Sequence, residues 1–101
     1  MEDILLKLKS IEKLVKSGIE DKVVERTVHK LYRYQSKKLS QDLDDVESRI
    51  KAFEGKYQIG CDEFLARYRT VELGDHADYL EWYALCDMAN RLRERMKVLT
   101  S

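Results

Sequence analysis

Apolar side chains recur at intervals of three and four residues through a stretch, Gly18 to Gly55, that holds no internal glycine or proline. This spacing places them on one face of an α-helix, because such a helix completes one turn about every 3.6 residues. The face comprises Val24, Val28, Leu31, Gln35, Leu39, Leu43, Val46, Ile50, Phe53 and Tyr57. The sequence therefore predicts one very long helix over residues 20–57, whose apolar line is interrupted only at Gln35.

Three shorter helices are predicted around it. Residues 2–17 repeat Ile4, Leu8, Ile11 and Val15 with lysines opposite, and Gly18 follows as a left-handed C-terminal cap. A short helix is predicted over residues 62–70. The last helix, over residues 77–99, should begin at an Asp75 cap with Asp78 three residues later, as in a capping box. Its apolar line comprises Trp82, Leu85, Ala89, Leu92, Met96 and Leu99.

These lengths predict an all-α fold in a single domain, 1–101, built as an extended antiparallel helical hairpin or bundle. Residues 39–57 match residues 82–99 in length, so they should pair antiparallel, with the short helix at the turn. Arg91 and Arg95 would then approach Asp42 and Asp45. The N-terminal helix would cover residues 20–38 by folding back, or would swap between two chains. The two arms should meet near Gln35, a hinge or a dimer crossing.

Charge changes the picture by its distribution along the chain. The 19 basic and 19 acidic residues cancel, but residues 1–40 carry about +4 and residues 41–101 about −4. One basic face of the long helix comprises Lys22, Arg26, His29, Lys30, Arg33 and Lys37. Most such faces only keep a helix solvated. If any stretch binds nucleic acid or an acidic protein partner, we expect it to be this one.

Chemistry-bearing residues form no motif. His29 lies among basic residues, and His76 lies among carboxylates that helix capping explains more simply than a metal does. Cys61 at a helix entrance and Cys86 on a helix flank give neither a disulfide framework nor a CxxC pair. We therefore expect no enzyme, no cofactor and no metal. Reduced cysteines, no signal peptide and no long apolar run favour a soluble cytoplasmic protein.

Aromatic residues gather around the short helix and the turns beside it: Tyr57, Phe64, Tyr68, Tyr79, Trp82 and Tyr83. A core position is the default for most of them. A short helix cannot bury all six, so some should lie at the surface, as aromatic side chains do at interfaces. The predicted contacts with a protein partner are Leu31, Tyr34, Tyr68, Tyr79 and Trp82.

Residues 20–99 resemble a group of small all-helical bacterial and archaeal proteins that look like antitoxins. The resemblance lies in four stretches: Val24, Glu25, Arg26, Thr27 with Leu31 and Tyr34; Ala52, Phe53, Glu54 with Tyr57; Asp62, Glu63, Phe64 with Tyr68; and, most specifically, Glu72, Leu73, Gly74, Asp75, Asp78, Tyr79, Glu81 and Trp82. Similar proteins carry glycine directly after the tyrosine matched by Tyr57, and a Ser or Thr cap soon after. This chain instead has Gln58, Ile59, Gly60 and Cys61.

The resemblance implies a non-enzymatic protein that masks the surface of another small, toxin-like protein. It supplies no residue-level map of the contact. A thin helical scaffold with one long arm and excess aromatic residues independently favours protein association, including a homodimer through the N-terminal arm, and would also suit a structural coiled-coil module. Nucleic-acid binding by the basic face is the alternative function.

Overall fold

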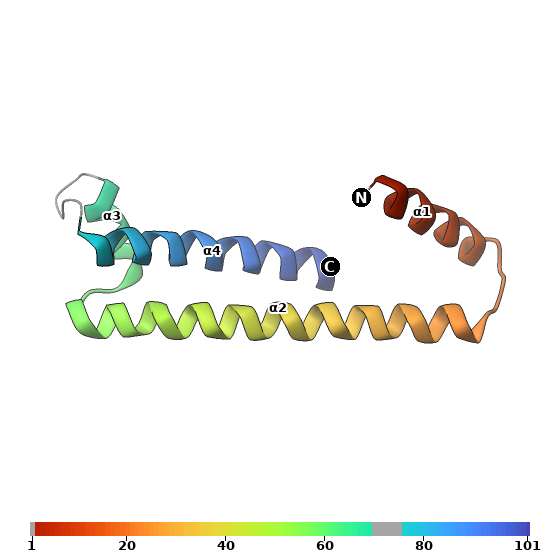
Figure 1. Cartoon of the computed structure of the whole chain (residues 1–101), viewed down its shortest axis with the longest axis horizontal. Coiled ribbons are helices and arrows are strands. Elements are labelled where there is room, and N and C mark those ends of the chain that lie inside the picture. The colour runs from red at the N-terminus through yellow and green to blue at the C-terminus, as the bar shows by residue number, and fades with distance from the viewer. Residues whose placement is uncertain (1, 70–75) are drawn as a thin grey trace. The chain divides into compact units, whose positions relative to one another are not determined.

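The structure is a computed structural model that describes residues 2–69 and 76–101. It contains α1 (Glu2–Lys16), α2 (Lys22–Tyr57), α3 (Cys61–Arg69) and α4 (Ala77–Thr100), and no strand occurs in the described ranges (Figure 1). The predicted all-α class is confirmed, and each helix begins and ends close to its predicted position. Within the same ranges, no helix is long and apolar enough to cross a membrane.

The chain forms two compact units, residues 1–32 and residues 33–101. The boundary falls inside α2, close to Gln35, where the sequence placed the meeting point of the two arms. The first unit holds α1 and the first turns of α2. The second holds the rest of α2 with α3 and α4.

Local hydrogen bonds set the helix ends of the first unit. Gly18 has a φ of +90°, and its N–H donates to the Val15 carbonyl at 3.1 Å, which ends α1 with the predicted left-handed glycine. The Asp21 carboxylate then accepts from the N–H groups of Val23 and Val24, at 2.8 and 3.3 Å. Asp21 is therefore the N-cap of α2, which is why that helix begins at Lys22 and not at residue 20.

The start of α4 differs from the prediction. His76 is its N-cap, and the imidazole Nδ1 accepts from the Asp78 N–H at 3.1 Å. Asp75, the predicted cap, lies outside the described residues. The predicted capping box between Asp75 and Asp78 therefore also lies outside the described residues. The Asp78 carboxylate accepts hydrogen bonds from Lys56 and Tyr57 at the end of α2.

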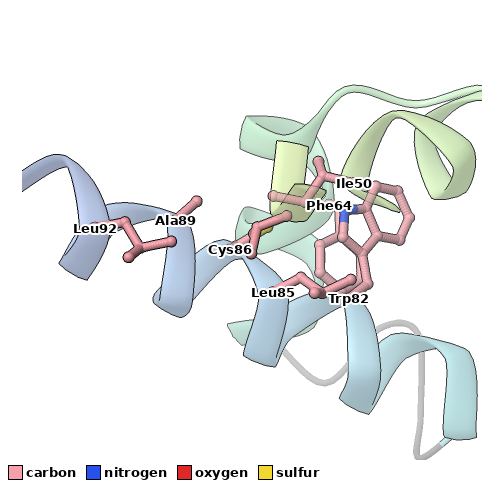
Figure 2. Close-up of a cluster of buried hydrophobic side chains, with 8 residues drawn as sticks. Ile50, Phe64, Trp82, Leu85, Cys86, Ala89 and Leu92 are labelled. Atoms are coloured by element: carbon pink, nitrogen blue, oxygen red, sulfur yellow. The ribbon is translucent and has the colours of Figure 1, made fainter. Parts of the chain in front are cut away.

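The second unit is an antiparallel pair of α2 and α4 with α3 packed at the turn, as the sequence predicted (Figure 1). Its buried side chains come from the three helices and pack in one cluster: Val46, Ile50, Phe64, Trp82, Leu85, Cys86, Ala89 and Leu92 (Figure 2). Phe64 stacks on Trp82 with ring centroids 3.9 Å apart and planes 6° apart. Phe53 and Tyr57 stack on the same indole, so Trp82 is the centre of the core.

Polar contacts between α2 and α4 lie at the edge of this core. Arg93 pairs with Glu47 across the two helices at 3.3 Å. Arg91 instead pairs with Asp87 one turn away on its own helix, and Asp45 pairs with Arg49. The predicted approach of Arg91 to Asp45 is therefore wrong, because each of them pairs on its own helix. In the described residues no ion pair joins Arg95 to Asp42 either.

Candidate partner-binding surface

The first unit carries a set of apolar side chains that we call the N-terminal apolar surface. They come from α1, from the connection after Gly18 and from the first turns of α2. The helical spacing of the sequence gathers the members of each helix on one stripe of that helix. The members are Ile4, Leu8, Ile11, Leu14, Val15, Ile19, Val24, Val28 and Leu31.

This surface is open to solvent. No residue of α1 is buried, and its stripe residues Ile4, Leu8 and Val15 expose about half of their side chains. The sequence predicted that α1 would cover residues 20–38. The structure differs, because Val28 remains 52% exposed and Leu31 remains 49% exposed.

Exposure along the single apolar stripe of α2 separates its two halves. Val46 and Ile50, in the second unit, are 4% and 7% exposed, since α3 and α4 cover them. Val28 and Leu31 have the same chemical character and the same helical spacing, but they lack such a cover. The apolar stripe of α2 is thus buried in the core at one end and exposed to solvent at the other.

A cavity of about 710 Å³ opens on this surface between the last turns of α1 and the first turns of α2. Ile11, Leu14 and Val15 line it from α1, and Val24 and Val28 line it from α2. Charged side chains, among them Asp21, Lys22 and Glu25, line it as well. Protein interfaces likewise combine apolar area with polar and charged groups.

Energetics indicate that such a surface is incomplete by itself. A helix of fewer than about 15 residues is marginal in water, and most helix stability comes from packing an apolar face. Each Leu, Ile or Val gains roughly 1.5–3 kcal/mol when it is fully buried. The apolar side chains of α1 lose about half of that gain, because about half of their surface is exposed, so a covering partner would stabilise this unit.

The basic face of α2 is also fully presented to solvent. Its six members are all exposed, and none makes an ion pair with another residue in the described part of the chain: Lys22, Arg26, His29, Lys30, Arg33 and Lys37. By contrast, Lys7 and Lys16 of α1 pair with Asp3 and Glu12. The charges of the basic face are therefore free to meet an external anion.

The five predicted partner contacts fall into different environments. Leu31 and Tyr34 are exposed, and their role stays a prediction. Tyr68 and Tyr79 are half-buried against the core. Trp82 is fully buried, so this candidate is corrected: the indole is occupied by stacking within the core and offers no surface to a partner.

Candidate chemical groups outside the two surfaces are few. No group of three or more His, Cys, Asp or Glu side chains in the described ranges could hold a metal ion. His76 acts as a helix cap, as described above, and His29 lines the 710 Å³ cavity.

The cysteines are the residues whose relation the sequence did not reveal. The sulfurs of Cys61 and Cys86 lie 2.6 Å apart, although 25 residues separate them in the chain. Cys86 is one helical turn beyond Trp82, and Cys61 opens the helix that packs on the same indole. The signal of this proximity in the sequence was that both cysteines lie close to residues expected to pack around Trp82. That signal identifies the pair only when the packing of α3 is known.

Comparison of the chain with protein-family models, with curated proteins and with solved structures gave no match. The geometry of this chain is accordingly the basis of the functional argument below.

Proposed function

We propose that this protein is a non-enzymatic binding module that covers the surface of another small protein in the cytoplasm, as the antitoxin-like partner in a two-protein system. The N-terminal apolar surface supplies the contact. Leu31 belongs to it, and Tyr34 follows one turn later on α2. The mechanism is occlusion: the partner is held inactive because its own apolar surface is buried against α1 and the first turns of α2.

The observation that carries this proposal is the exposure of the α1 stripe. Surfaces of this kind on soluble proteins mark interaction sites, because apolar area left in water is costly. The charged side chains that line the 710 Å³ cavity add the specificity that an apolar contact lacks. A helix pair that presents apolar anchors at i, i+4 and i+7 is suited to pack against another helix or into a groove.

The test is co-expression with the protein encoded by the adjacent gene, followed by purification through a tag on one of the two. We expect a stable complex. Val28→Glu should weaken it at least about tenfold, since a carboxylate would be buried in the contact. Recovery of the chain without that protein would contradict the proposal.

Val23→Glu is the matched control for Val28→Glu. Val23 is the same residue type on the same helix and is 73% exposed, but it does not line the cavity. We expect it to leave the affinity unchanged. Equal losses with both variants would show that added charge, not the apolar surface, controls binding.

In the absence of the partner, a second copy of the chain is the natural occupant of the same surface. An isologous dimer would bury both N-terminal apolar surfaces against each other. Sedimentation equilibrium of the free protein should give a dimer that Val28→Glu dissociates and Val23→Glu preserves. A monomer at every concentration would rule this dimer out.

The second candidate function is nucleic-acid binding through the basic face of α2. The observation that favours it is the set of six exposed basic side chains without intramolecular ion pairs in the described residues. Binding of an RNA or DNA oligonucleotide should then weaken steeply as salt increases. Charge reversal to Glu at Lys22, Arg26, Lys30 and Arg33 should abolish it. Binding that survives this reversal would exclude the basic face.

A further inference from the structure

We propose that Cys61 and Cys86 form a reversible intramolecular disulfide when a peroxide oxidises the protein. Their sulfurs are 2.6 Å apart, and both are free thiols in this structure. A disulfide requires that the two side chains already face each other across a short gap, because the backbone cannot move far within a packed core. Here the two residues meet that requirement from different helices, α3 and α4.

Access to the pair comes from one side. Both cysteines line a surface cavity of about 380 Å³, together with Glu54, Asp62 and Arg93. Cys61 is half-buried, whereas only 4% of Cys86 is exposed. A small oxidant can therefore reach Cys61 first. A second protein molecule cannot reach Cys86 without opening the core.

The two thiols have different roles because their environments differ. Cys61 is the first residue of α3 and is only half-buried, so its sulfur is the more accessible of the two. Burial, and then the contact with Cys61, raises the pKa of Cys86 to about 12, so Cys86 stays a thiol at neutral pH. We assign Cys61 as the nucleophile that meets the oxidant and Cys86 as the resolving thiol.

The chemistry balances in two steps. The Cys61 thiolate attacks one peroxide oxygen, the O–O bond breaks, and Cys61 becomes a sulfenic acid as hydroxide leaves. The Cys86 sulfur then attacks the Cys61 sulfur, and the sulfenic oxygen leaves with the Cys86 thiol proton as water. Two thiols are oxidised by two electrons. Hydrogen peroxide is reduced to water.

The bond would join α3 to α4 at the edge of the core. It closes a loop between positions 25 residues apart, which restricts the unfolded chain more than the folded one. The expected consequence is a second unit that resists unfolding more strongly under oxidising conditions. The N-terminal apolar surface contains neither cysteine, so this inference is independent of the proposed binding function.

The test treats the full-length protein with hydrogen peroxide and analyses it by intact mass and by non-reducing peptide mapping. We expect a monomer lighter by two hydrogen atoms, with one linked peptide that contains Cys61 and Cys86. Its thermal midpoint should rise by at least about 5 °C, and dithiothreitol should reverse both changes. Because the peptide map uses the unaltered protein, its result does not depend on whether a variant folds.

Matched variants test the two roles. Cys86→Ala should leave Cys61 as a sulfenic acid that a dimedone probe captures, and Cys61→Ala should leave Cys86 unmodified. Disulfide-linked dimers, added oxygen without a linked peptide, inert thiols, or a linked form that melts with the reduced protein would each overturn the proposal.

Discussion

At the scale of single residues, Gln58 shows how a turn can adopt a backbone conformation that its residue type disfavours. Its φ is +58°, a left-handed conformation that favours glycine. The Gln58 amide compensates in part, because it donates to the Gly55 carbonyl at 2.8 Å. The turn thus requires a left-handed backbone conformation at this position, and Gln58 adopts it less readily than glycine would.

Gln58→Gly should therefore stabilise the second unit. Removal of the left-handed strain is worth about 1 kcal/mol, and the lost hydrogen bond is exposed and weak. Urea denaturation followed by fluorescence measures the change. Gln58→Ala is the control, since it removes the same hydrogen bond but keeps a Cβ, and it should give no gain. Destabilisation by Gln58→Gly would show that the amide contact matters more than the backbone.

A second residue-scale feature is the cap of α3. The Cys61 N–H donates to the Glu54 carboxylate at 2.8 Å, so the last turns of α2 supply the acceptor for the first N–H of the next helix. No Ser or Thr precedes α3 in the segment 58–60. Glu54 takes over the role of a local cap, which explains how α3 starts at Cys61 without one.

At the scale of elements, α2 and α4 are held by their packed faces and by one polar cluster at their ends. Lys56 and Tyr57, at the end of α2, both donate to the carboxylate of Asp78 in the first turn of α4, with the Lys56 contact at 2.7 Å. Asp78 also suits the positive end of the α4 dipole. This cluster fixes the register of the two helices where the chain reverses direction.

The cluster predicts a pH dependence of stability. Hydrogen bonds from Lys56 and then Tyr57 hold the pKa of Asp78 below its ordinary value of 3.8. Because the folded-state pKa is lowered, this stabilisation is present above the ordinary value and is lost as pH falls through the folded-state pKa. The urea midpoint should therefore fall below about pH 4, modestly, because the groups are near solvent.

The same cluster also predicts a loss of stability at alkaline pH, which follows from the two donors, Lys56 and Tyr57. The hydrogen bond to Asp78 is the largest cause that raises the pKa of Lys56 above 10.5 and that of Tyr57 above 10.0. Stabilisation from both is present below those ordinary values and is lost as pH rises through the folded-state pKa of each.

Asp78→Asn is the variant that tests this cluster. It should flatten both limbs of the pH profile of the urea midpoint. Asp87→Asn is the control, since Asp87 pairs only within α4 and in solvent, so its loss should leave the profile unchanged. An unaltered profile in Asp78→Asn would exclude the cluster as the cause.

At the scale of the whole molecule, the two units differ in how they are stabilised. Every buried residue in the described ranges belongs to the second unit. The first unit has amphipathic helices but no core of its own. We therefore expect the two units of the isolated chain to unfold separately, as segments with different local stability do.

Two probes can separate these transitions. Trp82 is the only tryptophan of the chain and lies at the centre of the core of the second unit, so its fluorescence reports that unit alone. Far-ultraviolet circular dichroism reports helix in both units. On heating, helix signal should be lost before Trp82 becomes exposed.

Deletion of residues 2–18 should remove the early loss and leave the Trp82 transition unchanged. Coincident transitions in the intact chain would show instead that the first unit draws its stability from the second. A lower Trp82 midpoint after deletion would point to the same conclusion. Addition of the binding partner should merge the two transitions, because binding to the folded state stabilises the first unit.

Much of the fold could be predicted from the sequence because it depends on local rules. The apolar periodicity located the helices, Gly18 marked the end of α1, and matched lengths predicted the antiparallel pairing of α2 with α4. Charge pairing could not be predicted in the same way. Arg91 has Asp87 one turn away on its own helix, whereas the sequence pattern offered it acidic residues on the facing helix, and only the side-chain geometry selects between them.

The candidate site, too, could be predicted from the sequence only in part. The pattern along the chain determined which residues of α1 and α2 are apolar and that a basic face lies opposite to them. Exposure was not determined, since Val28 and Val46 occupy equivalent positions on one stripe and differ only in what covers them. Tertiary structure decided that Trp82 is core and not contact surface, and that Cys61 meets Cys86. The physical reason is that periodicity specifies a face of one helix, whereas burial and proximity depend on which other helix packs against it.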